Sequence, residues 1–378
     1  MPWDINFGNP PIGHAVEINE EDDSAKIQII EFCSSEDGDH FISRLEGFPS
    51  QVLEKIPKDE LLKESTVDHM LVIFRKDQTA TAYINELVLT STVQIKKPAI
   101  NKGDAVYKSD ITDIVELNFG DIDIPNDCGI LFLFSVGWRK GLFFDFSPLT
   151  PSKQVIRNFD LKKEFAAQYT YLLFQNRFKI SDQSWSFLFN NNWFPFIALN
   201  ETNINQMLRT AEVMGDLNQI VGQIHSDIMG NIDAWILKWK NNTYFTNHIE
   251  FIQRAVERFK AGDSISTVSI LYPIIEGIMR NNHSIVSPNE DPKQKALVKS
   301  TLKKIGTHDN PKPLILPEMF RKYLNDVYFA NFDPKKPKGM SRNTVSHGVA
   351  ATSDFDKKNA CITILILEQI FFCLSSEP

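Results

Sequence analysis

The side chains best suited to chemistry lie together in the ten-residue stretch 339–348, which reads Gly-Met-Ser-Arg-Asn-Thr-Val-Ser-His-Gly. Arg342 stays charged at any physiological pH, whereas His347 can exchange a proton near neutrality. RNA carries its own nucleophile, the 2′-hydroxyl. A histidine that moves a proton and an arginine that neutralises the phosphorane could therefore cleave it. Asn343 could orient the histidine or the phosphate, and the products would be a 2′,3′-cyclic phosphate and a 5′-hydroxyl.

The spacing of these residues has a geometric consequence. On one helix, Arg342 and His347 would lie roughly 140° apart around the axis, with Asn343 inside that arc. One helix could therefore direct all three side chains into one groove. The alternative interpretation is structural: a surface arginine followed by a histidine that ends the helix before Gly348.

The stretch, the helices expected before it and the apolar helix expected after it together resemble the HEPN superfamily over about residues 250–378. In that family an arginine, a polar residue and a later histidine mark the ribonucleases. The resemblance implies a metal-independent endoribonuclease without a cofactor, in which two protomers bring Arg342, Asn343 and His347 into one composite site. It would be a bacterial toxin or an effector of antiviral defence. The alternative is a non-catalytic HEPN-like module for dimerisation or nucleotide binding in a larger complex.

Charge is distributed unevenly along the chain, whose net charge is −8. Residues 1–60 carry 14 acidic and 4 basic side chains, a balance of −10, whereas residues 293–342 carry 12 basic and 4 acidic ones, a balance of +8. The basic run leads directly into the arginine–histidine stretch, which favours RNA binding through Lys335, Lys336 and Lys338. The alternative is a solvated basic surface. The acidic residues could shield the basic region until a trigger arrives. The N-terminal part could be a sensor, an inhibitor or a platform for a regulatory protein.

Other polar groups admit simpler interpretations. Glu276 and Arg280 are one helical turn apart. They are expected to form either a surface ion pair or a pair that supports the catalytic groove. The carboxylates in 121–125 and 289–292 are expected in turns or edge strands, because no third ligand follows at metal-binding spacing. His283 is expected in a polar loop. The sequence contains no glycine-rich nucleotide-binding motif.

The elements expected to position these residues change in type along the chain. Residues 65–150 read as antiparallel strands, in the runs 70–74, 79–95, 111–119, 130–136 and 142–146, with a hairpin turn at the glycines of 137–141. Residues 27–33 also read as a strand, and residues 50–64 as a helix. From about residue 160 the apolar spacing becomes helical.

The helical part is expected to form helices over 162–178, 247–261, 264–281, 295–304, 317–328 and 354–374, with Ser264 as an N-cap. Residues 203–241 are expected to form one long helix or a pair. The arginine–histidine stretch should begin another. The sequence thus predicts an α+β protein with a β-rich domain over 1–150, a helical segment over 151–245 and a HEPN-like bundle over 246–378.

Composition suggests a soluble protein, and the scattered cysteines fit a reducing cytoplasm; the HEPN resemblance implies a homodimer or larger assembly. The N-terminus has no secretory signal pattern, and the apolar run 360–374 is short and contains Glu368 and Gln369, so no membrane span is expected. Cys33, Cys128, Cys361 and Cys373 lack metal-ligand or redox spacing. The last two are expected to be buried free thiols.

Overall fold

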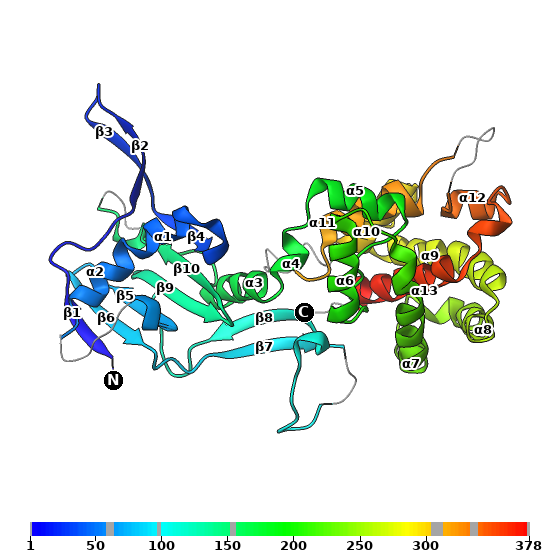
Figure 1. The fold of residues 1–378 in the computed structure, drawn as a ribbon, viewed down its shortest axis with the longest axis horizontal. Coiled ribbons are helices and arrows are strands. Elements are labelled where there is room, and N and C mark those ends of the chain that lie inside the picture. Colours follow the sequence, from blue (N-terminus) through cyan, green and yellow to red (C-terminus); the bar gives the residue numbers. More distant parts are fainter. Residues whose placement is uncertain are drawn as a thin grey trace. The chain divides into compact units, whose positions relative to one another are not determined.

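The chain forms two compact units, each with its own core (Figure 1). One unit comprises Met1–Val93 and Ile114–Gln175, and the other comprises Gln94–Asp113 and Asn176–Pro378. The computed structural model describes residues 2–57, 64–96, 100–151, 156–303, 313–332 and 339–375. An antiparallel sheet precedes a helical region, which confirms the α+β class.

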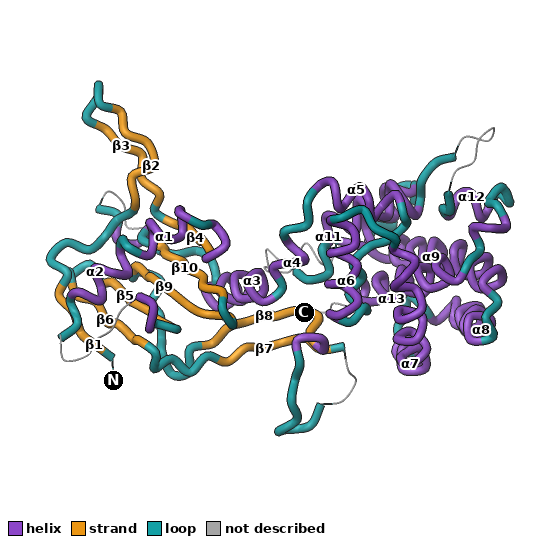
Figure 2. The backbone as a smooth tube through the Cα atoms, viewed as in Figure 1, coloured by secondary structure: helices purple, strands orange, loops and turns teal. Residues whose placement is uncertain are grey.

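The first unit is built on a six-stranded antiparallel sheet with strand order β1-β6-β5-β9-β10-β4. Figure 2 shows these strands beside the short helices of the unit. The strands are β1 Trp3–Asn6, β4 Ile30–Ser34, β5 His69–Phe74, β6 Thr79–Ile84, β9 Gly129–Val136 and β10 Arg139–Asp145. The predicted runs 70–74, 130–136 and 142–146 are thus confirmed as central strands.

Apolar side chains cover both faces of this sheet because its central strands alternate between two buried environments. Met70, Val72 and Phe74 of β5 share one core with Phe41 of α1 (Asp39–Leu45) and Val52 of α2 (Phe48–Glu54). On the opposite face, α3 (Leu161–Leu173) places Phe165 against Phe132 of β9, with ring centroids 4.8 Å apart. The many phenylalanines therefore serve mainly as core residues.

Two further strand pairs complete the β structure: β2 His14–Asn19 with β3 Ser24–Gln28, and β7 Thr90–Ile95 with β8 Ile111–Asn118. The prediction of one strand over 27–33 is wrong. The chain forms two strands there, because β3 and β4 belong to different sheets and are separated at Ile29. The predicted helix over 50–64 starts and ends earlier, as α2. Part of its expected range, 58–63, lies outside the described residues.

The second unit is helical. Its main helices are α4 Gln175–Phe178, α5 Asp182–Asn190, α6 Glu201–Glu212, α7 Val221–Lys240, α8 Ile249–Lys260, α9 Ser264–Val286, α10 Gln294–Leu302, α11 Pro317–Tyr323, α12 Arg342–Ser346 and α13 Lys357–Ser375. The N-cap of α9 is Asp263 rather than Ser264, because the Asp263 carboxylate accepts the backbone N–H of Ser266 at 2.9 Å.

One continuous apolar core joins helices α5 to α13. The division of the chain therefore differs from the expected boundaries at 150 and 245: the helices before and after residue 245 share this core, and α3 packs on the sheet instead. Residues 94–113 also belong to the helical unit. The strand-like sequence of residues 94–113 could not reveal which unit they join, because that assignment depends on tertiary contacts.

The helix α13 lies in the middle of this core. It is the one helix among the described residues that is long and apolar enough to cross a membrane, yet 78% of its apolar 18-residue stretch is buried inside the protein. Its packing is that of a core helix in a soluble protein. Cys361 and Cys373 of α13 are buried free thiols, as predicted, and Cys33 and Cys128 are buried and free as well.

Candidate functional site

The short helix α12 carries the arginine–histidine stretch, and its ends are set by local hydrogen bonds. Ser341 is its N-cap: the Ser341 hydroxyl accepts the N–H of Thr344 at 3.2 Å, and the Thr344 hydroxyl accepts the N–H of Ser341 at 2.9 Å. The helix ends at His347, its C-cap, and Gly348 follows with a φ of +67°. The left-handed backbone at Gly348 favours glycine and ends the helix there.

Arg342 forms an ion pair with a buried carboxylate. Its Nε pairs with Oε2 of Glu276 on α9, and the other oxygen, Oε1, lies 2.6 Å from Nη2 and 2.8 Å from Nε of Arg280. The Glu276 side chain is 4% exposed, whereas those of Arg342 and Arg280 are 24% and 48% exposed. Two guanidinium groups therefore share one carboxylate, and Glu276 is not part of a simple surface pair. The cluster carries a net positive charge at the protein surface.

Asn343 is buried and uses its full hydrogen-bonding capacity. Its Nδ2 donates to the backbone oxygens of Phe329 at 3.0 Å and Ala330 at 3.2 Å. Its Oδ1 accepts from Nε2 of Gln294 on α10 at 3.1 Å and from Nη1 of Arg342 at 3.3 Å. Asn343 therefore fixes α12 to the chain that follows α11 and also orients the guanidinium beside it. In the described structure its amide points into these contacts and does not face solvent.

His347 has a different environment. Its side chain is exposed, and its ring lies 5.6 Å from that of Phe332, centroid to centroid. Its ring nitrogens make no hydrogen bond with any residue in the described ranges. The structure thus brings Arg342, Asn343, Glu276 and Arg280 into one bonded cluster, with His347 at the end of the same helix and outside that cluster.

The basic residues expected to bind RNA are only partly visible. Lys335, Lys336 and Lys338 lie outside the described residues. Several other cations of the 293–342 run make surface ion pairs: Lys293 with Asp291 at 3.1 Å, Lys299 with Glu290 at 3.9 Å, and Arg321 with Glu318 at 2.5 Å. Glu290 and Asp291 lie outside the run and offset part of its positive balance, whereas Glu318 is already counted in it.

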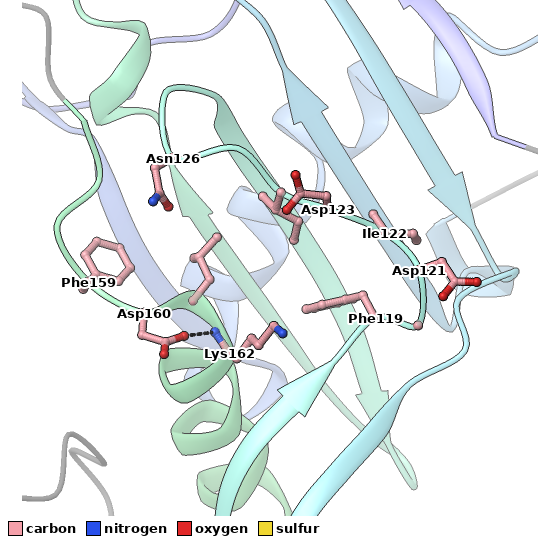
Figure 3. A pocket seen from close by; sticks show the side chains of 11 residues that line it. Phe119, Asp121, Ile122, Asp123, Asn126, Phe159, Asp160 and Lys162 are labelled. Atoms are coloured by element: carbon pink, nitrogen blue, oxygen red, sulfur yellow. Dashed lines mark hydrogen bonds between the residues drawn. The ribbon is translucent and has the colours of Figure 1, made fainter.

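No group of three His, Cys, Asp or Glu side chains among the described residues could hold a metal ion. Asp121 and Asp123 follow β8 in a loop that lines a cavity of about 520 Å³ in the first unit. Figure 3 shows their carboxyl groups apart from each other and from Asp160, which instead accepts the N–H of Lys162 at 2.9 Å and caps α3. This cavity therefore offers no convergent set of carboxylates.

The prediction that His283 lies in a polar loop is wrong. It lies buried on α9 and not in a polar loop, with Nδ1 3.2 Å from the Ser300 hydroxyl and Nε2 3.0 Å from the Glu290 carbonyl. Both ring nitrogens are used to hold α9, α10 and the loop between them. The turn at 289–292 is thus fixed from inside through the backbone oxygen of Glu290.

Sequence reasoning missed Gln294, which holds the amide oxygen of Asn343. A glutamine at the start of a helix carries no chemical signal of its own. Its importance depends on a partner that lies far along the chain.

Comparison with protein-family models, with curated proteins and with solved structures gives no match for this chain.

Proposed function

We propose that this chain is a metal-independent endoribonuclease of the HEPN type, cleaving RNA to 2′,3′-cyclic phosphate and 5′-hydroxyl ends. The observation that supports this most is the contrast within α12. His347 is exposed, with ring nitrogens that make no hydrogen bond to any described residue, and Arg342 is oriented by Glu276 and Asn343. A proton-transfer group and a preorganised cation on one short helix fit phosphodiester cleavage.

Each side chain has a distinct role in the proposed reaction. His347 takes the proton of the 2′-hydroxyl as this oxygen attacks phosphorus, or gives a proton to the departing 5′-oxygen. Arg342 stabilises the charge that builds on the phosphorane oxygens, and the partly exposed Arg280 adds positive potential beside it. Glu276 positions both guanidinium groups, and Asn343 positions that of Arg342. No step requires a metal ion or a cofactor.

A second copy of the chain would complete the site. One histidine cannot remove the 2′-proton and protonate the leaving oxygen at the same moment, whereas two copies of α12 supply two histidines. We therefore propose a homodimer or larger assembly that pairs the helical units, acting in the cytoplasm as a toxin or antiviral effector. The acidic residues of 1–60 would provide a surface for a regulatory protein.

A second candidate is a non-catalytic HEPN-like module for dimerisation or nucleotide binding. One observation favours it: the internal contacts of Arg342 and Asn343 fix α12 in place, and this structural role explains them without catalysis. The two candidates make opposite predictions for RNA incubated with the purified protein.

The test is cleavage of a mixed RNA pool in EDTA, with mapping of the end groups. The parent protein should cleave. His347→Ala should lower the rate by about two orders of magnitude or more. Ser346→Ala, an exposed change on the same helix, is the matched control and should cleave normally. Intact RNA with the parent protein would favour the non-catalytic module, and equal cleavage by His347→Ala would place the site elsewhere.

A further inference from the structure

A second cavity lies within the helical unit and has a volume of about 200 Å³. Its walls combine apolar and ionisable side chains, among them Lys96, Trp235, Lys238, Glu368 and Phe372. Sites for drug-sized ligands usually span roughly 300–1,000 Å³, so this cavity admits a molecule of only a few heavy atoms. It is separate from the residues of α12 and α9 described above.

Glu368 is a buried acid with a free oxygen at this cavity. Its side chain lies in the centre of α13 and has no exposed surface. Oε2 accepts the indole N–H of Trp239 at 2.6 Å, but Oε1 has no hydrogen-bond partner among the described residues. The adjacent Gln369 differs, because it accepts from the N–H of Ile197 and donates to the carbonyl of Ile315. A buried carboxyl with an open position is unusual and is more typical of a site than of a core.

Lys96 lines the same cavity, and its amine is held in place. Nζ donates to the carbonyl oxygen of Leu199 at 3.0 Å. A neutral amine has two N–H groups and one lone pair, so this hydrogen bond leaves the lone pair available for attack on an electrophile. Lys238 approaches from α7, donates to the carbonyl of Lys96 at 2.5 Å and lies 6.0 Å from the ring centroid of Phe372.

The charges around Lys96 favour its neutral form. Burial and, second, the nearby Arg177 lower the pKa of Lys96 to about 7, although Glu201, Asp110 and Glu368 act in the opposite direction. Glu201 is itself paired with Arg177 at 2.9 Å and with Lys108 at 3.3 Å, which limits its effect on Lys96. Burial also raises the pKa of the Glu368 carboxyl to about 7. A neutral amine and a protonated acid can therefore coexist in this cavity near neutral pH.

We propose that Lys96 is a nucleophile that forms a Schiff base with a small, neutral aldehyde or ketone, with Glu368 as the acid that assists the loss of water. A desolvated lysine beside another cation is a recognised arrangement for imine chemistry. Trp235 and Phe372 offer apolar walls for a short carbon chain. The Lys238 cation, which lines the cavity, disfavours an amine substrate.

The reaction balances without any further reactant. The lone pair of Lys96 Nζ attacks the carbonyl carbon, and after proton transfer from nitrogen to oxygen a neutral carbinolamine results. Glu368 then protonates the hydroxyl group, a C–O bond breaks, and water leaves. The nitrogen loses its remaining proton to the Glu368 carboxylate, so the sum is amine plus carbonyl giving imine plus water. This inference does not depend on the proposed cleavage of RNA.

The test is reductive trapping with butanal and cyanoborohydride at pH 7, followed by digestion and mass measurement of the modified lysines. Lys96 should be alkylated roughly tenfold or more faster than the exposed Lys293, because an ordinary lysine with a pKa near 10.4 is almost wholly protonated at this pH. Lys238, at the same cavity, is the matched internal control and should also lag. Urea present during trapping should abolish the preference.

The variant Glu368→Gln tests the role of the acid. The amide oxygen can keep the bond from Trp239, so the fold should be retained, which circular dichroism checks. The –NH₂ group that then faces the cavity cannot protonate a leaving hydroxyl. Trapping at Lys96 should slow by about tenfold or more. Two results would overturn the inference: no preference for Lys96 over Lys238 in the folded parent, or equal trapping in Glu368→Gln.

Discussion

Replacing Arg342 by alanine should destabilise the protein before any question of catalysis arises. The change leaves Glu276 with Arg280 alone, and the Glu276 side chain is only 4% exposed. Removing one partner of a buried ion pair costs about 3–5 kcal/mol. Because Arg280 still holds one carboxylate oxygen and Arg342 is 24% exposed, we expect a smaller loss in the free energy of unfolding, about 2 kcal/mol.

Urea unfolding of a double-mutant cycle measures this coupling. Once Glu276→Gln has removed the charge, Arg342→Ala should cost much less than in the parent, giving a coupling energy of about 1–2 kcal/mol. Arg321→Ala is the matched control, since Arg321 pairs with the exposed Glu318 and its loss should stay within about 0.5 kcal/mol. If Arg342→Ala matched this control, or if the cycle were additive, the ion pair would not hold α12 as described.

Three further results are expected. Burial raises the pKa of Glu368 from 4.5 to about 7, so the stabilisation by its bound proton is complete below pH 4.5 and is lost as the pH rises to about 7. The free energy of unfolding should therefore fall by about 3 kcal/mol over this pH range. Unfolding measured across the same range should show no such fall for Glu368→Gln. If the proposed RNA contacts involve Lys335, Lys336 and Lys338, replacing all three by alanine should flatten the dependence of RNA affinity on salt, and an unchanged slope would assign them to a solvated surface. Light scattering should show a dimer or larger assembly, and a fully active monomer would contradict the composite site.

The sheet could be predicted well because its signals are local. Apolar runs identify β5 and β9, and Gly137 has a φ of +63° in the tight turn between β9 and β10, which a glycine accepts without strain. The break at Ile29 could not be predicted in this way. Residues on both sides of it have strand character, and only their different partners separate β3 from β4.

The candidate site was predictable in its residue types but not in its contacts. Sequence spacing pairs Glu276 with Arg280, whereas the third member of the cluster, Arg342, lies on another helix. His283 appeared solvated because its neighbours in the chain are polar, yet it is buried against Ser300 of α10. The apolar pattern of α13 correctly predicted a helix but could not reveal that Glu368 lines a cavity.

The position of α13 has a consequence for synthesis of the protein. This helix packs against α7 and α9 in the middle of the core, yet it follows every other described helix in the chain. At about 5–20 residues per second, a ribosome needs roughly 1–4 seconds to add its 19 residues. Throughout that interval the apolar faces of α7 and α9 lack their partner. The nascent helical unit is therefore a natural client for chaperones, and it can complete its core only after α13 has left the ribosome.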